Sequence, residues 1–224
     1  MGVMTVAALI ERASIIIQDT TNVRWPKEEL LKWLNDGQRE IVLHKPAAYP
    51  QDSVETLSAG TKQSIPVTGV SLIDVPRNEV GDKRAIRIVD REILDAERPG
   101  WHNETAAQEV KHYVFDTRNP KKFFVYPPND GTGQVNLIYS AAPTDLALGT
   151  EESPVTITLD DIYSNALLDY IIYRASIKDA EYAVNAQRAE AMYQTFLNSL
   201  GIHRERVMMN NPNLHTRSNI SRNE

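Results

Sequence analysis

The chain of 224 residues contains no cysteine, which excludes disulfide bonds, thiolate metal sites and thiol nucleophiles. It also contains no apolar run that approaches the ~20 residues needed to cross a bilayer. Glu11 and Arg12 interrupt the apolar start of the chain, so we expect no signal peptide and no membrane partner. These absences are typical of a protein made in a reducing compartment.

The sequence also lacks the short motifs that mark familiar reaction centres. No two of the five histidines are spaced as in zinc proteases, and neither a phosphate-binding glycine loop nor a nucleophile elbow is present. His102 lies near Asp95 and Glu104, but a solvated loop histidine is a simpler interpretation than a metal ligand. Asp160 and Asp161 resemble a metal pair, yet they also suit the N-terminus of a helix. We therefore predict no catalytic residue, no metal, no cofactor and no enzyme activity.

Charge is unevenly distributed along the chain. The net charge is −6, but residues 202–224 carry four arginines against two acids, a balance of +2, which leaves −8 for residues 1–201. Proteins that bind nucleic acid need clustered lysine and arginine to neutralise phosphates. The acidic body therefore argues against nucleic-acid binding and is compatible with DNA that passes by without being held.

Two amphipathic helices are predicted near the start of the chain. Apolar residues recur with a helical period across residues 4–18. A second helix is expected from Pro26, which suits a first helical position, to Pro46, which ends it. Gly37 lies on the apolar face of this helix and indicates either a tolerated kink or the close approach of another helix or chain.

The period changes to alternation from about residue 53 to residue 143, which predicts an antiparallel β lobe. One hairpin is expected where residues 54–57 and 64–67 flank a turn at Gly60. A second is expected between residues 112–116 and 122–126. Further strands are predicted at 70–75, 85–89 and 134–140, with a helical turn at 90–97 and a loop at 127–131.

Helical periodicity returns after Asp160, which is a good N-cap. The helix from Asp161 to about Ile177 is apolar or aromatic on nearly every side, so we expect it to be buried within its own bundle or by neighbouring subunits. A last helix is expected from about 180 to Leu200, with Gly201 as its C-terminal cap.

This order of elements predicts an α+β fold. The simplest packing is a four-helix bundle with an antiparallel β lobe inserted between the second and third helices, followed by an extended C-terminal tail. The expected limits are 1–50 and 151–201 for the two halves of the bundle, 51–150 for the lobe and 202–224 for the tail. Packing between subunits is expected at Trp33, Gly37, Tyr163, Tyr170 and Tyr182.

The C-terminal segment, residues 202–224, shows neither helical nor strand periodicity. Its apolar residues Met208, Met209, Leu214 and Ile220 are separated by arginine and asparagine donors. Such a segment cannot build a core of its own, but it can become ordered on another surface. A frayed, disordered end is the alternative interpretation.

Two segments of the sequence resemble a known family. The stretch RWPKEELLKWLNDGQREIV, residues 24–42, resembles the opening of phage adaptor proteins, which are head-to-tail connectors similar to the tail tubular A proteins of short-tailed phages. Residues 159–182, which begin LDDIYSNALLDY, resemble the second helical half of the same family. The β lobe and the tail match this family in layout more than in motif.

The resemblance implies a structural protein of the virion neck. It implies a dodecameric ring beneath the portal, with the helices forming the ring, the β lobe facing the tail and the C-terminal segment embracing the portal. Implied partners are the portal protein, a tail nozzle or other tail protein, and the genome, which crosses the channel at ejection without specific binding. The protein would be made in the cytoplasm of the bacterial host. The residues expected to dock on the portal are Arg204, Arg206, Met208, Met209, Asn210, Leu214, Arg217 and Ile220.

Three other interpretations remain open at this point. A DNA-binding ring, such as a small packaging subunit, would need a basic inner face. A tail-associated hydrolase would need paired acids in a cleft. A stopper or tail-terminator ring differs from an adaptor in its partner and not in its chemistry.

Overall fold

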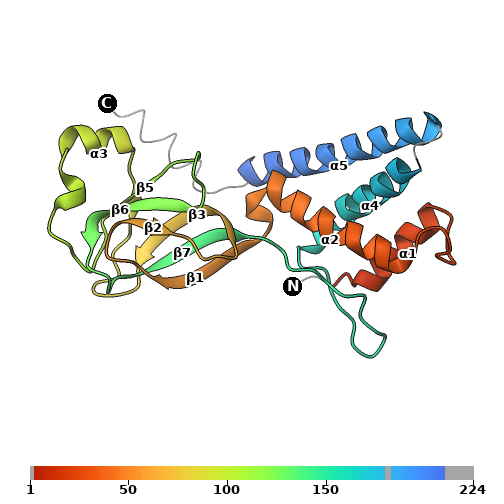
Figure 1. Cartoon of the computed structure of the whole chain (residues 1–224), viewed down its shortest axis with the longest axis horizontal. Helices are drawn as coiled ribbons and strands as arrows, with labels where there is room; N and C mark the ends of the chain where they lie inside the picture. The colour runs from red at the N-terminus through yellow and green to blue at the C-terminus, as the bar shows by residue number, and fades with distance from the viewer. Residues whose placement is uncertain (1–2, 180–182, 210–224) are drawn as a thin grey trace. The chain divides into compact units, whose positions relative to one another are not determined.

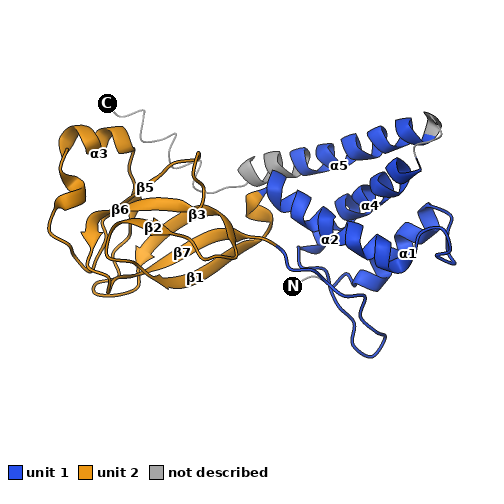
Figure 2. Ribbon diagram, viewed as in Figure 1, with its two compact units in different colours: residues 1–45, 143–224 blue, residues 46–142 orange. Residues whose placement is uncertain are grey.

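Two compact units make up the chain in the computed structural model, which describes residues 3–179 and 183–209 (Figures 1 and 2). For residues 202–209 the description covers the helical backbone alone. The helical unit consists of Met1–Lys45 and Pro143–Glu224, and the β unit is Pro46–Ala142. The predicted α+β class is confirmed, because long helices and two sheets occupy separate stretches of the chain.

Four long helices build the helical unit, and side-chain caps precede α1 and the 3-10 turn that leads into α4. Helix α1 is Val6–Ile16, α2 is Lys27–His44, α4 is Ser164–Lys178 and α5 is Ala183–Met209. The Thr5 hydroxyl accepts the N–H of Ala8 at the start of α1. The Asp160 carboxylate accepts the N–H of Ile162 and opens the 3-10 turn η3, Asp161–Tyr163, that leads into α4. The cap interpretation of Asp160 is thus confirmed.

Helix α4 is the centre of the helical unit. Helices α1, α2 and α5 all pack against it, and nine of its fifteen residues are buried. The apolar character on nearly every side of α4 therefore has an explanation within a single chain. Tyr170 contributes to this core, with its ring 5.3 Å from that of Phe196 on α5.

The loop before α4 is held against helix α2 by specific polar contacts. Asn35 on α2 accepts the N–H of Leu146 and donates to the Leu146 carbonyl. The Gln38 side chain accepts the N–H of Thr158. Because both side chains are buried, these hydrogen bonds fix the path of residues 143–160 without a secondary structure of their own.

Two sheets form the β unit (Figure 1). The first has the order β1-β7-β3, with β1 at Pro50–Thr56, β7 at Gln134–Ala141 and β3 at Gly69–Asn78. The second has the order β2-β6-β5-β4. Its strands are β2 at Gly60–Ser64, β6 at Lys122–Asn129, β5 at His112–Phe115 and β4 at Arg87–Ile88. Helix α3, Arg91–Glu97, and the 3-10 turns η1, Pro46–Ala48, and η2, Trp101–Asn103, complete the unit.

Alternation along β5 and β6 gives the second sheet two buried faces. Tyr113 and Phe123 join the main core, which also contains Val135 and Leu137 from β7. Val114 and Phe124 point to the opposite face, against Trp101, which is fully buried. Period-two alternation usually leaves one face of a strand for solvent, and here α3 and η2 cover that face.

The strand pairing corrects several expectations. The prediction of a hairpin around Gly60 is wrong, because β1 pairs with β7 and β2 pairs with β6. The lobe is not purely antiparallel, since β4 pairs in parallel with β5 over two residues. The expected loop at 127–131 begins later, because β6 continues through Asn129. The β5–β6 hairpin and the last strand are confirmed.

Candidate interaction surfaces

The final helix departs from the expected end at Gly201. Helix α5 continues to Met209, so residues 202–209 belong to a helix and not to an extended tail. Gly201 is exposed and has nothing within 4 Å of an added Cβ. A glycine in a helix costs only about 1 kcal/mol relative to alanine, and the arginine, glutamate and methionine that follow it are good helix formers. The helix propensity of these residues allows α5 to continue past Gly201.

The residues expected to dock on the portal therefore fall into two groups. Arg204, Arg206, Met208 and Met209 lie in the last turns of α5. The positions Asn210, Leu214, Arg217 and Ile220 lie outside the described residues. The structure thus assigns a helical backbone to the first group, which sequence periodicity did not predict.

The residues expected between subunits make contacts inside the chain. An added Cβ on Gly37 would lie 3.0 Å from Cδ1 of Tyr170, so the close approach at this glycine is made by α4. Trp33 is buried against Trp25, with ring centroids 5.6 Å apart. Tyr163 is buried too, and Tyr182 lies outside the described residues. Burial leaves little of Trp33, Gly37, Tyr163 and Tyr170 exposed to a second copy.

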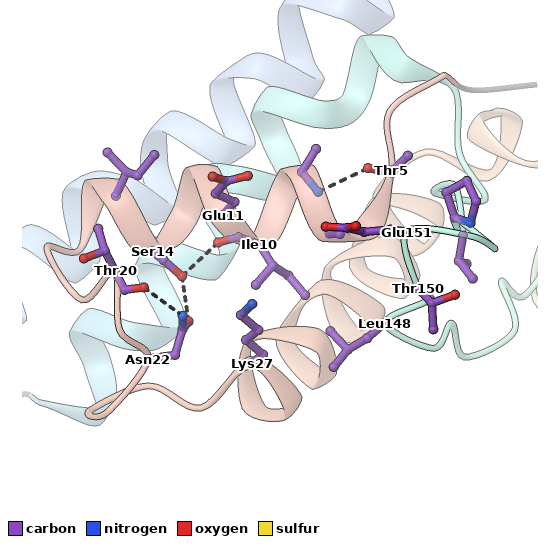
Figure 3. A pocket seen from close by; sticks show the side chains of 16 residues that line it. Thr5, Ile10, Glu11, Ser14, Thr20, Asn22, Lys27, Leu148, Thr150 and Glu151 are labelled. Atoms are coloured by element: carbon purple, nitrogen blue, oxygen red, sulfur yellow. Dashed lines mark hydrogen bonds between the residues drawn. The ribbon is translucent and has the colours of Figure 1, made fainter.

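A groove of about 890 Å³ runs along α1 in the helical unit (Figure 3). Its walls are α1, the turn before α2 and the loop around Gly149. Ser14 braces the wall by donating to the Ile10 carbonyl and contacting Asn22. Glu11 and Glu151 lie at the groove and form no ion pair within the described residues. The groove is lined by both apolar and polar side chains, and its charged residues are Glu11, Glu151 and Lys27.

Lys45, at the C-terminus of α2, is the most unusual charged residue of the helical unit. Its side chain is 8% exposed, and its Nζ has no hydrogen-bond acceptor within the described residues. The ammonium lies 5.3 Å from the centre of the Tyr163 ring. Burial lowers the pKa of Lys45 below its usual value. Burying the Lys45 ammonium therefore costs free energy in the folded state.

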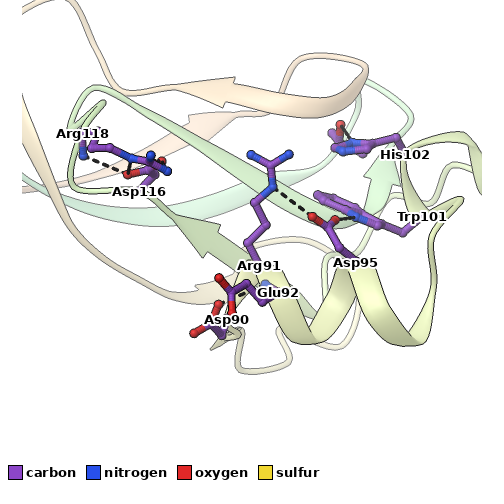
Figure 4. Close-up of polar contacts among 9 residues, drawn as sticks. Asp90, Arg91, Glu92, Asp95, Trp101, His102, Asp116 and Arg118 are labelled. Atoms are coloured by element: carbon purple, nitrogen blue, oxygen red, sulfur yellow. Dashed lines mark hydrogen bonds and ion pairs between the residues drawn. The ribbon is translucent and has the colours of Figure 1, made fainter.

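A second groove, of about 670 Å³, lies beside α3 in the β unit. Asp95 accepts a hydrogen bond from the Trp101 indole N–H at 2.8 Å and contacts Arg91 (Figure 4). The Trp101 bond and then Arg91 hold the pKa of Asp95 below its usual range. Hydrogen bonds from Arg118 likewise lower the pKa of Asp116. These hydrogen bonds therefore favour the charged form of both carboxyls.

His102, once a candidate metal ligand, has a packing role. Its Nδ1 lies 2.8 Å from the Thr61 hydroxyl, and its ring stacks on Trp101 at 3.7 Å. The Asp161 carboxylate accepts the N–H groups of Val3 and Met4. Across the described ranges, no group of three His, Asp or Glu side chains is placed to hold a metal ion.

None of the helices in the described part of the chain combines the length and the apolar character that crossing a bilayer requires. The model of the SU10 adaptor protein family matches the chain over residues 4–217. No curated protein matches the chain.

Proposed function

We propose, on the premise that this chain belongs to the SU10 adaptor protein family, that it assembles as a homo-oligomeric ring between the portal and the tail. The family is one of structural proteins of the phage neck, with portal and tail proteins as partners. The ring, its dodecameric state and its DNA channel are our proposal. Portal docking is assigned to residues 202–224.

One observation carries this proposal, namely the length of α5. Helix α4 has 15 residues and α5 has 27, which corresponds to about 22 Å against about 40 Å of helix. The last buried side chain described on α5 is Leu200. The helix continues nine residues further, to Met209, and the sequence there includes Met208 and Met209. Methionine-rich helix ends are adaptable binding elements.

The two units supply the remaining parts of the ring. In our proposal, α1, α2, α4 and α5 form a four-helix bundle that builds the ring, and the β unit faces the tail. Each unit has a hydrophobic core of its own. Each can therefore hold its shape while it contacts a different neighbour.

The charge of the body supports a channel through which DNA moves without being held. No lysine or arginine occurs between Lys122 and Arg174, whereas seven aspartates and glutamates do. Among these, Asp145, Glu151, Glu152 and Asp160 are exposed. Acidic side chains do not neutralise DNA phosphates. They therefore release no counterions from the DNA, and this contribution to binding is missing.

The test is co-assembly of the chain with the portal of the same phage, using two truncations and a matched control. One truncation ends at Met209 and the other at Gly201. The control keeps all residues but scrambles the order of 210–224, so that length and charge are preserved. We expect the truncation at Met209 to keep the circular dichroism of the described helices and the truncation at Gly201 to lose only the contribution of residues 202–209. Both are expected to lose portal binding.

The scrambled control is expected to lose portal binding as well, which would separate specific docking from simple charge attraction. Normal co-assembly of the chain that ends at Gly201 would refute the assignment of portal docking. Binding to isolated tail tubes with no affinity for the portal would instead identify a tail-terminator ring.

A further inference from the structure

The first strand of the β unit has a free edge along its whole length among the residues that the structure describes. Strand β1 lies at the end of its sheet, and β7 is its only pairing partner within those residues. The Leu57 N–H donates to Gly133 and the Ala141 N–H donates to Tyr49. In an antiparallel pair the backbone groups of successive residues point to opposite sides. The odd-numbered residues of β1 therefore face β7, and Asp52, Val54 and Thr56 direct their N–H and C=O groups outward.

This free edge carries little protection against pairing with another strand. None of the seven residues of β1 is buried, and the Val54 side chain is 55% exposed. Natural edge strands are usually blunted by lysine, proline or a bulge. Here Pro50 protects only the start, and no bulge interrupts the register with β7. No hydrogen bond involving the outward N–H or C=O groups of residues 52, 54 and 56 occurs within the described residues.

A second free edge exists on β2, at the end of the other sheet. The Ile65 N–H donates to the Lys121 carbonyl, in register with the pairing of Ser64 and Lys122. By the same alternation, Lys62 and Ser64 direct their backbone groups away from β6. Both residues are exposed, and Lys62 together with the register shift between Gly60 and Lys62 guards this edge against a strand that carries no acid.

The charges on the two edges are opposite and lack ionic partners. Residues 50–56 contain Asp52 and Glu55 and no base. Asp52 accepts a hydrogen bond from Asn136, and Glu55 accepts one from Ser53, but neither forms an ion pair within the described residues. On the other edge, Lys62 and its neighbours Lys121 and Lys122 likewise form no ion pair there.

We infer that the β1 edge of one copy adds to the β2 edge of a second copy, so that sheets of adjacent subunits join. The occupant is a second copy because the two edges of the same chain are complementary in charge and in free backbone groups. A contact between two different edges is heterologous and can close into a ring, whereas β1 pairing with β1 would give an isolated dimer. This inference rests on the proposed ring and names the contact that holds its β units together.

Val54→Pro is the first variant that tests this contact. Proline removes the outward N–H of residue 54, and its ring obstructs the edge, while the hydrogen bonds of β1 to β7 remain. We expect rings on the portal to be lost or reduced at least tenfold in amount, with an unchanged thermal transition. The control is Val67→Pro, at a side chain that is 99% exposed and lies outside every strand.

A charge exchange tests the same contact without altering the backbone. Glu55→Lys alone and Lys62→Glu alone are each expected to weaken assembly, and the double variant is expected to restore it. Lys111→Glu, another exposed lysine without an ion pair in the described part of the chain, is expected to have no effect. If either residue acted only within its own chain, the double variant would not restore assembly.

The absence of cysteine allows a direct test of proximity. Full-length chains with Val54→Cys are mixed with chains that carry Ser64→Cys or Lys62→Cys, added to the portal and oxidised. A disulfide between the two different chains supports the inference. Crosslinks only between two copies of the Val54→Cys chain, or normal rings from Val54→Pro, would overturn it. If the wild-type chain does not bind the portal, the proposed function is refuted instead.

Discussion

Replacing Gly37 by alanine tests the close approach of α2 and α4 that organises the helical unit. In an open helix this change stabilises by about 1 kcal/mol, because alanine has the higher helix propensity. At position 37 the new Cβ would lie 3.0 Å from Cδ1 of Tyr170 and 3.2 Å from Cδ2 of Leu167. Both side chains are buried, so neither can move away freely.

The packing cost is expected to exceed the gain in propensity. Overpacking a buried site typically costs about 1–3 kcal/mol. Subtracting the gain of about 1 kcal/mol leaves a net loss of about 1 kcal/mol for Gly37→Ala. The matched control is Gly201→Ala, where the added Cβ meets nothing within 4 Å and only the gain of up to about 1 kcal/mol remains.

Urea unfolding followed by far-ultraviolet circular dichroism measures both variants. Midpoints can be compared directly where the slope of free energy against urea is unchanged. We expect Gly37→Ala to be less stable than Gly201→Ala by about 2 kcal/mol. Equal stabilisation of both variants would show that α2 and α4 are not in contact at Gly37.

Three further predictions concern single polar side chains. Lys45→Met should raise the free energy of unfolding by about 1 kcal/mol, since it removes a buried unpaired charge. Because burial lowers the folded pKa of Lys45, the wild type gains stability as pH rises from that folded value towards 10.5. The advantage of the variant, followed by thermal melts, should therefore shrink over that window; a constant advantage would contradict the assignment. Asn35→Ala should cost about 1–3 kcal/mol, since it leaves both backbone groups of Leu146 without their partner, and urea unfolding without a loss would show that the loop is not clamped there. Asp161→Ala should accelerate amide exchange at Met4, since the N–H groups of Val3 and Met4 hold the pKa of this carboxyl down; in the wild type this stabilisation is present above about 3.8, the ordinary pKa of an aspartate, and is lost as pH falls through the lower folded value.

Local sequence signals predicted the elements whose backbone hydrogen-bond partners lie near in the chain. Helices α1, α2 and α4 follow from apolar periodicity and from caps such as Asp160. The β5–β6 hairpin follows from two alternating runs separated by a short turn. In each case the signal lies within about twenty residues, so no long-range contact has to be known.

Pairing between distant segments could not be predicted in the same way. The turn at Gly60 suggested a hairpin, but β1 finds its partner at Gln134–Ala141. Alternation tells which side chains share a face and does not tell which strand lies alongside. For the same reason the free edges of β1 and β2 could not be recognised before the two sheets were known.

The prediction that α5 ends at Gly201 failed for a different reason. Glycine after an amphipathic run is a common stop signal, but it is a preference of about 1 kcal/mol that favourable neighbours outweigh. For the site residues, composition pointed to residues 202–224 and gave no information on their conformation. Trp33 and Tyr170 pack against Trp25 and Phe196 of the same chain, and their expected contacts with a neighbouring subunit stay a prediction.

The most direct test of the account is the mass of the assembly that the purified chain forms with and without the portal. We predict that the free chain, of 25.3 kDa, stays smaller than a ring and becomes a closed, dodecameric ring only on the portal. The same mass in both samples, or a ring on the portal from a chain that ends at Gly201, would contradict it.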